Sequence, residues 1–292
     1  MEPKSKAKAI RVGILLTVLL GASIQYLIVW RAENWVPEWE GRESVAVVLL
    51  VPKALSDEES ELLAEIKAFA FEDEGKATFT ALKYWFKREY ARYDPKAGFS
   101  PVYFKVVGPV SVDTLPPPPP RAGVQLSFSE RYSQTTAFLD YYSEQREHLS
   151  FKPRNAVFVS FYQEKDAPSF RGVHSVADRR SRSGFVFAPL SAKGVNDAII
   201  NVGHELLHLY GATDKYRGKQ CVYPQGFYAP LQEPRYPQTY AEVMAQGIPV
   251  ESGKAEEDLE LFADMRVGVE TAFEIGWIGK ERRDRYYGGD LA

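Results

Sequence analysis

One short stretch of this 292-residue chain has residues whose types and spacing suit metal-dependent hydrolysis. It begins His204-Glu205-Leu206-Leu207-His208 and has the form H-E-x-x-H. On a helix, residues four apart lie about 40° apart around the axis and roughly 6 Å apart along it, so both histidines face the same way and can share one metal ion. Glu205 lies beside them, where it can take a proton from a water on that metal.

The residues after the second histidine offer a third ligand. Gly211 can end the helix and take a positive φ, which lets the chain turn sharply. That turn would bring Asp214 back towards the two histidines, giving the longer pattern H-E-x-x-H-x-x-G-x-x-D. A five-residue match alone also arises by chance on ordinary amphipathic helices. The extension places a helix stop and an oxygen ligand where the geometry needs them, and therefore favours a metal site.

The helix that must position this motif is predicted to begin at Asn196, because Asn196 and Asp197 are good start signals. One of its faces is polar and the opposite face is apolar. The polar face carries Asp197, Asn201, His204 and His208, and the apolar face carries Ile199, Val202, Leu206 and Leu209. Such a helix is expected to lie between a hydrophobic core and a cleft.

The elements before this helix read as strands and helices of one domain. Continuous or alternating apolar runs predict strands at 44–51, 102–107, 156–162, 172–177 and 184–188. Ser56-Asp57-Glu58-Glu59 is a capping box that opens a helix, and residues 129–148 form another. After Asp214, prolines interleaved with aromatic residues predict an ordered irregular segment, followed by a helix over 256–275.

The N-terminus has the pattern of a membrane segment. Residues 1–11 are basic, 12–30 are uncharged and mostly apolar, 31–43 form a polar linker, and 44–292 form the folded domain that carries the metal motif. The length of the apolar run suits one membrane-spanning helix, and the basic flank predicts a cytosolic N-terminus. The domain would then lie on the extracytoplasmic side, which in a bacterium is the periplasm. A signal peptide cleaved near Gly21-Ala22-Ser23 is the alternative.

The amino-acid composition limits which partners the protein is expected to bind and which residue types could ligate the metal. The net charge is −3 and no long basic stripe appears, so nucleic acid is not the expected partner. The single cysteine, Cys221, cannot form an intrachain disulfide. The chain has only four histidines, which favours an oxygen donor as third ligand. The sequence does not predict an oligomeric state.

With this order of elements, the chain resembles the metzincin metallopeptidases over residues 44–292. Their motif is H-E-x-x-H-x-x-G-x-x-H, with Asp last in a minority such as snapalysin. The resemblance implies an α+β zincin domain: a twisted mixed sheet with a backing helix and an active-site helix, then an irregular half ending in a helix. It implies Zn²⁺ held by His204, His208 and Asp214, with Glu205 as general base. Met244, in Glu242-Val243-Met244-Ala245, is similar to the family's Met-turn.

Some assignments stay open within this resemblance. Thermolysin-like enzymes take their third ligand from a following helix, and Glu256, Glu257 or Glu260 could serve in that way. Some relatives use a tyrosine after the methionine to stabilise the oxyanion, but position 246 is Gln here. Candidates for oxyanion or substrate contacts are Tyr216, Tyr240 and His174.

The expected function is a membrane-anchored zinc peptidase acting on a peptide or protein substrate. Strand 172–177 is expected to be an antiparallel edge that pairs with an extended peptide. Two alternatives use the same residues: a zinc amide hydrolase acting on cell-wall peptides, and a non-catalytic binding domain stabilised by zinc.

Overall fold

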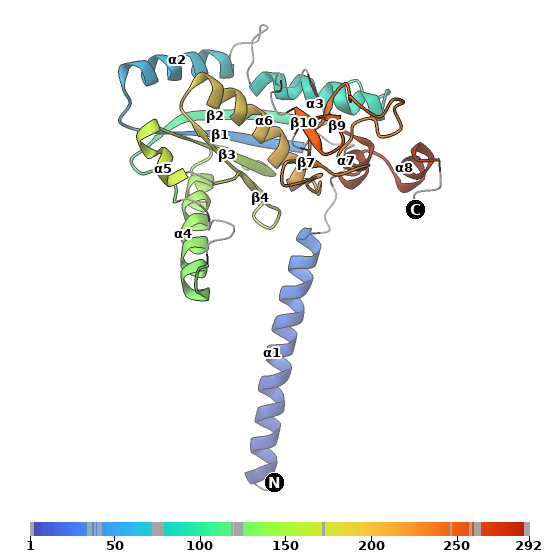
Figure 1. The fold of residues 1–292 in the computed structure, drawn as a ribbon. Coiled ribbons are helices and arrows are strands. Elements are labelled where there is room, and N and C mark those ends of the chain that lie inside the picture. Colours follow the sequence, from blue (N-terminus) through green and yellow to red (C-terminus); the bar gives the residue numbers. More distant parts are fainter. Residues whose placement is uncertain are drawn as a thin grey trace.

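A central sheet with helices on both faces forms the body of the protein, and one long helix extends away from it (Figure 1). The computed structural model describes residues 3–33, 37, 39, 43–71, 79–117, 119, 125–170, 173–245, 247–256, 259 and 264–288. The fold is mixed α/β, and the sheet is mostly parallel.

The sheet has five strands in the order β2-β1-β3-β5-β4. They are β1 (Glu43–Pro52), β2 (Val102–Val112), β3 (Asn155–Tyr162), β4 (Val176–Asp178) and β5 (Ser183–Pro189). The first four in that order are parallel, and β4 pairs antiparallel with β5 at the edge. The predicted edge strand is therefore present, but it is shorter than 172–177. It begins at Val176, and Gly172 lies outside the described residues.

Helices cover both faces because successive side chains of a strand point to opposite sides. On one face, Val45, Val47 and Leu49 of β1 pack with α2 (Asp57–Phe71), α3 (Phe79–Tyr93) and α6 (Ala192–Leu209). On the other, Val48 and Leu50 pack with α4 (Phe128–Glu147) and α5 (Ala167–Phe170), which follows a short 3-10 turn, η1 (Glu164–Asp166). The predicted capping box of α2 is confirmed.

In that capping box, the Ser56 amide donates to Glu59 Oε2 at 2.8 Å, and the Glu59 amide donates to Ser56 Oγ at 3.2 Å. Two amide groups at the start of α2 therefore have partners within the chain, as the sequence pattern predicts.

The segment after α6 consists of short elements, as predicted. These are β6 (Tyr216–Arg217), β7 (Gln220–Cys221), β8 (Ala241–Glu242), β9 (Ile248–Glu251), β10 (Lys254–Glu256), β11 (Met265–Arg266), α7 (Val269–Glu274) and α8 (Lys280–Tyr286). The predicted helix over 256–275 is wrong. Glu256 pairs with Ile248 in a hairpin, and Met265 pairs with Ala241. Strand pairing within the folded domain thus overrides the helical spacing of apolar residues.

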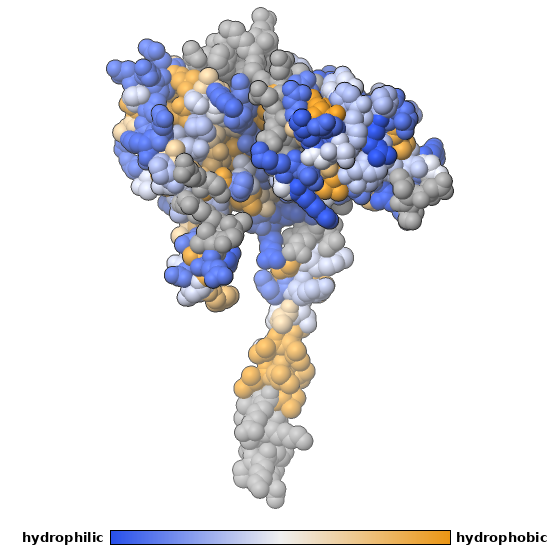
Figure 2. Space-filling view, in the orientation of Figure 1, coloured by the Kyte–Doolittle hydropathy of each residue, from blue (hydrophilic) through white to orange (hydrophobic). Residues whose placement is uncertain are grey.

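Helix α1 (Pro3–Glu33) contains the predicted membrane segment. Val12–Arg31 is long and apolar enough to cross a membrane, and none of it is buried against the domain. Figure 2 shows this apolar surface as a band on the extended helix. The same length and composition also fit a signal sequence, such as one cleaved near Gly21-Ala22-Ser23.

Candidate metal centre

Helix α6 carries the H-E-x-x-H motif along the sheet, and it begins earlier than Asn196. Its N-cap is Ser191, whose Oγ accepts from the Gly194 amide at 3.1 Å. A Cβ on Gly194 would lie 2.0 Å from the Pro189 carbonyl oxygen, so this glycine allows the helix to start directly after β5. The sequence prediction missed this start because the requirement comes from packing against the preceding strand. The predicted apolar face is buried: Ile199, Val202, Leu206 and Leu209 are all at most 2% exposed.

Two histidines and an aspartate converge at the end of α6. His204 Nε2 and His208 Nε2 are 3.0 Å apart, and Asp214 Oδ1 lies 3.3 and 3.2 Å from them. Gly211 has φ 111°, as the predicted turn requires. The turn brings Asp214 back to the histidines, and the three donor atoms could hold one metal ion. Glu256, the alternative ligand, lies in β10, while Glu257 and Glu260 lie outside the described residues.

The hydrogen bonds of the two Nδ1 atoms determine that the Nε2 atoms of both histidines are free to bind a cation. His204 Nδ1 lies 3.1 Å from the Val243 carbonyl oxygen, and His208 Nδ1 lies 2.8 Å from that of Ala212. A carbonyl oxygen only accepts, so each Nδ1 must carry the hydrogen. In the neutral rings, both Nε2 lone pairs then face each other across 3.0 Å. The two lone pairs repel each other, and a cation or a shared proton between them removes the repulsion. The arrangement therefore suits a bound metal ion.

Asp214 is the charged member of the cluster. Partial burial raises its pKa, but hydrogen bonds and positive charge from His204 and His208, when their rings are protonated on Nε2 as well, outweigh burial and hold the pKa well below its usual value. The carboxylate is therefore ionised at neutral pH and available as an oxygen ligand.

Glu205 lies beside the cluster with its carboxyl group almost fully buried. It is 3% exposed, and its Oε2 has no hydrogen-bond partner among the described residues. Burial raises its pKa, while the nearby His204 and His208 oppose that rise. Gly184 of β5 lies underneath, where a Cβ would come within 3.2 Å of the Glu205 Cβ. A small residue in the strand therefore lets α6 lie close to the sheet at the point that carries Glu205.

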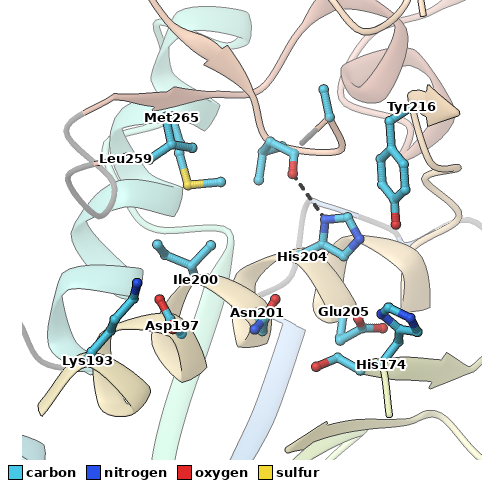
Figure 3. Close-up of a pocket in the computed structure, with 13 residues that line it drawn as sticks. His174, Lys193, Asp197, Ile200, Asn201, His204, Glu205, Tyr216, Leu259 and Met265 are labelled. Carbon is cyan, nitrogen blue, oxygen red and sulfur yellow. Dashed lines mark hydrogen bonds between the residues drawn. The ribbon is translucent and has the colours of Figure 1, made fainter. Parts of the chain in front are cut away.

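A cavity of about 430 Å³ opens next to His204 and Glu205. Figure 3 shows His174 beside Glu205, and the Tyr216 side chain directed towards His204. Burial raises the pKa of the Tyr216 hydroxyl, and the charges of Asp214 and Glu205 raise it further. Two of the three candidate contact residues thus line the cavity.

Tyr240, the third candidate contact residue, lies away from Tyr216 and His174. Its ring lies under the Arg266 guanidinium at 3.9 Å and against the Tyr228 ring. It is not among the residues that line the cavity. The structure gives no support to a role for Tyr240 in contacting substrate.

The turn at Met244 contacts His204 through the preceding residue, Val243. Val243 supplies the carbonyl that His204 contacts, and Met244 itself is fully buried. The buried Glu242 carboxylate accepts from the Met244 amide at 2.6 Å and from the Thr271 hydroxyl at 2.6 Å. This turn therefore holds the His204 ring in place, with a buried acid holding the turn to α7.

Lys215 and Glu274 are important to the site but were not identified from the sequence. Lys215 is 3% exposed, and its Nζ donates to Glu274 Oε2 at 2.5 Å and to the Thr213 carbonyl at 2.9 Å. Its amide donates to the Met244 carbonyl at 2.7 Å. The residues on both sides of Asp214 are thus clamped. No local pattern identifies this pair, because 59 positions separate the two residues.

Comparison with known proteins adds no relative to this description. No protein-family model matches the chain, and no curated protein matches it.

Proposed function

We propose that this protein is a membrane-anchored, zinc-dependent peptidase of the metzincin type. The observation that carries the proposal is the arrangement at the end of α6. Two histidine Nε2 atoms and an ionised aspartate face one point, and a buried glutamate carboxyl lies beside them. A structural metal site has no need for that glutamate, whereas a hydrolytic site needs a base there.

The donor set and its spacing fit zinc. Tetrahedral zinc with ligand bonds of about 2.0–2.1 Å places its ligand atoms about 3.3 Å from one another. The three separations among His204 Nε2, His208 Nε2 and Asp214 Oδ1 are 3.0, 3.3 and 3.2 Å. Three protein ligands leave a fourth position open, which is the arrangement of catalytic rather than structural zinc.

The residues of the chain then have separate tasks in amide hydrolysis. When bound, zinc supplies Lewis acidity, which polarises the substrate carbonyl and makes water a nucleophile near neutral pH. Glu205 takes the proton from the attacking water and passes it to the leaving nitrogen. Burial raises the pKa of this carboxyl, which makes the carboxylate a stronger base for the first of these two steps. Tyr216, from the other side of the cavity, is placed to donate to the developing oxyanion.

An extended peptide is the substrate that the edge of the sheet favours. Among the strands that the structure describes, β4 pairs with β5 alone, so its other edge is available for backbone hydrogen bonds. His174 and Ser175, directly before β4, line the cavity. A peptide paired with this edge would therefore pass the cluster.

The proposed orientation in the membrane follows from the basic residues before the apolar segment of α1 and from the length of that segment. Lysines and an arginine precede the apolar segment of α1, which favours a cytosolic N-terminus and an extracytoplasmic domain. Such a peptidase would act at the outer surface of the membrane, in the periplasm of a bacterium.

The metzincin likeness rests on the pattern from His204 to Asp214, the turn at Met244 and the irregular C-terminal half. The short α7 departs from the expected long terminal helix.

Cleavage of a peptide library by the full-length protein in detergent tests the proposal. Cleavage should occur with zinc, stop with a chelator and return when zinc is restored. A zinc-loaded protein that cleaves no peptide would contradict the peptidase and favour a non-catalytic zinc domain. Cleavage that persists in chelator would contradict the metal mechanism.

A further inference from the structure

The N-terminal half of α4 projects from the body without packing against it. Phe138 is the first buried residue of this helix. The ten residues before it, 128–137, extend about 15 Å at the rise of an α-helix. None of these ten residues is buried. We call this part, residues 127–137, the α4 tip.

Two aromatic side chains make the α4 tip apolar on one side. Phe128 is 87% exposed and Tyr132 is 65% exposed. They are four residues apart, so they lie on the same face of the helix, and their rings stack with centroids 6.3 Å apart. Phe128 has the largest exposed fraction of any large apolar side chain among the described residues. An exposed stacked pair of aromatic rings is a surface that a membrane or another molecule is expected to cover.

The α4 tip is also a formed helix end. Ser127 and Glu130 make a reciprocal capping box: the Ser127 amide donates to Glu130 Oε2 at 2.8 Å, and the Glu130 amide donates to Ser127 Oγ at 3.3 Å. The cap holds the first turn in place, so the two rings are presented in a fixed orientation.

The membrane lies on the side of the body towards which this tip points. Helix α4 and helix α1 project from the same side of the sheet in Figure 1. The free end of α4 reaches the level at which the apolar band of α1 begins in Figure 2. A bilayer that surrounds this band would have its surface at the α4 tip.

The connection between α1 and the body keeps the two close. Trp39 is buried between Tyr210 and Trp277, with ring centroids 4.9 and 5.8 Å away, and its indole N–H donates to the Ile275 carbonyl at 2.7 Å. Six positions separate Glu33, the end of α1, from Trp39, which is at most about 20 Å of extended chain. The body cannot move far from the membrane, and the α4 tip stays within its reach.

We propose that the α4 tip inserts into the lipid interface through Phe128 and Tyr132 and sets the height and tilt of the domain above the membrane. Aromatic residues favour this region of a bilayer, and the capped helix end presents both rings to it. With α1 as one support and the α4 tip as a second, the domain would hold one orientation. The inference rests on the membrane anchoring in the proposed function, but not on peptidase activity.

Spin labels on the full-length protein in phosphatidylcholine and phosphatidylglycerol vesicles test this. The single native cysteine is replaced by C221S, and labels are placed by F128C or Y132C. The matched control is Y84C, because Tyr84 is an aromatic residue 54% exposed on α3, which lies across the sheet from α4 (Figure 1). L19C, in the apolar band of α1, reports whether the anchor spans the bilayer.

The measured quantity is the collision rate with oxygen, which concentrates in lipid, relative to that with a water-soluble nickel complex. The ratio should be several-fold higher at positions 128 and 132 than at 84, and highest at 19. Equal ratios at 128, 132 and 84, with a high ratio at 19, would overturn the inference and leave the anchor intact. A low ratio at 19 would overturn the anchor itself. Immobilisation or spin–spin broadening at 128 in detergent alone would instead assign the tip to a protein partner or a second copy.

Discussion

Helices α6 and α4 pack on opposite faces of the same sheet and differ sharply in how much of their length they use for packing. Helix α6 has 18 residues, ten of them buried, and its whole length lies on the sheet. Helix α4 has 20 residues, and only Phe138 and Tyr142 are buried. The first helix is held firmly enough to position side chains for chemistry. The second is anchored at one end, which leaves its other end for contact with its surroundings.

This difference predicts different consequences of substitution in the two helices. Changes in α6 should affect catalysis or stability strongly, because one face of the helix is buried in the core and the other carries the metal cluster. Changes at the α4 tip should leave the folded domain almost unaffected and alter only its relation to the membrane.

The largest effect is expected for Glu205→Gln on α6. Glutamine keeps the size of the side chain but cannot accept a proton, so the rate of peptide cleavage should fall by about 10²–10⁴-fold. Zinc content should stay at the wild-type level, because Glu205 is not one of the three ligands. Steady-state cleavage and metal analysis on the same sample check this. Undiminished cleavage would exclude Glu205 as the base.

Leu206→Ala tests the packing of the same helix. Leu206 is fully buried in the core between α6 and the sheet. Its truncation should lower the free energy of unfolding by about 2–5 kcal/mol. Chemical denaturation in detergent measures this. A loss below about 1 kcal/mol would show that α6 is less tightly packed than the comparison requires.

Lys215→Met tests the clamp that links α6 to the C-terminal half. Methionine fills a similar volume but leaves the Glu274 carboxylate without its buried partner. The free energy of unfolding should fall by about 3 kcal/mol. Zinc affinity should fall by about 10-fold, because the Thr213 carbonyl next to Asp214 loses its hydrogen bond from Lys215 Nζ. Competition with a chromogenic chelator measures the affinity. The matched control is Lys254→Met, an exposed lysine paired with Glu251, which should change neither quantity.

The smallest effect on folding is expected for Phe128→Ala at the α4 tip. Its ring is almost fully exposed, so the free energy of unfolding in detergent should change by less than about 0.5 kcal/mol. The same denaturation measurement used for Leu206→Ala provides the comparison. A loss near that of Leu206→Ala would show that the tip packs against the body in solution.

Local sequence patterns predicted the parts of the site that lie close together in the chain. The helical spacing of His204 and His208 and the turn at Gly211 were sufficient to bring Asp214 to the histidines. The capping box at Ser56 and the run in β1 were recognised for the same reason. In each case, the physics acts over a few residues.

Features that depend on packing between different elements were missed or wrong. The start of α6 depends on Gly194 lying against Pro189, and the clamp at Lys215 depends on Glu274. Apolar residues at helical spacing over 256–275 predicted a helix, but Met265 instead pairs with β8. The sequence also predicted α4 as a helix without showing that half of it lacks packing. Periodicity identifies an apolar face but cannot say what that face contacts.

The most direct test of the central claim is the metal content and coordination of the purified full-length protein. Wild type should contain about one zinc per chain, and X-ray absorption should show two imidazole nitrogens and a carboxylate oxygen at about 2.0–2.2 Å. Asp214→Ala should lose most of this zinc, because it removes one of the three proposed ligands that converge at the end of α6. Unchanged zinc content in Asp214→Ala, or a wild-type protein that binds no zinc, would contradict the account.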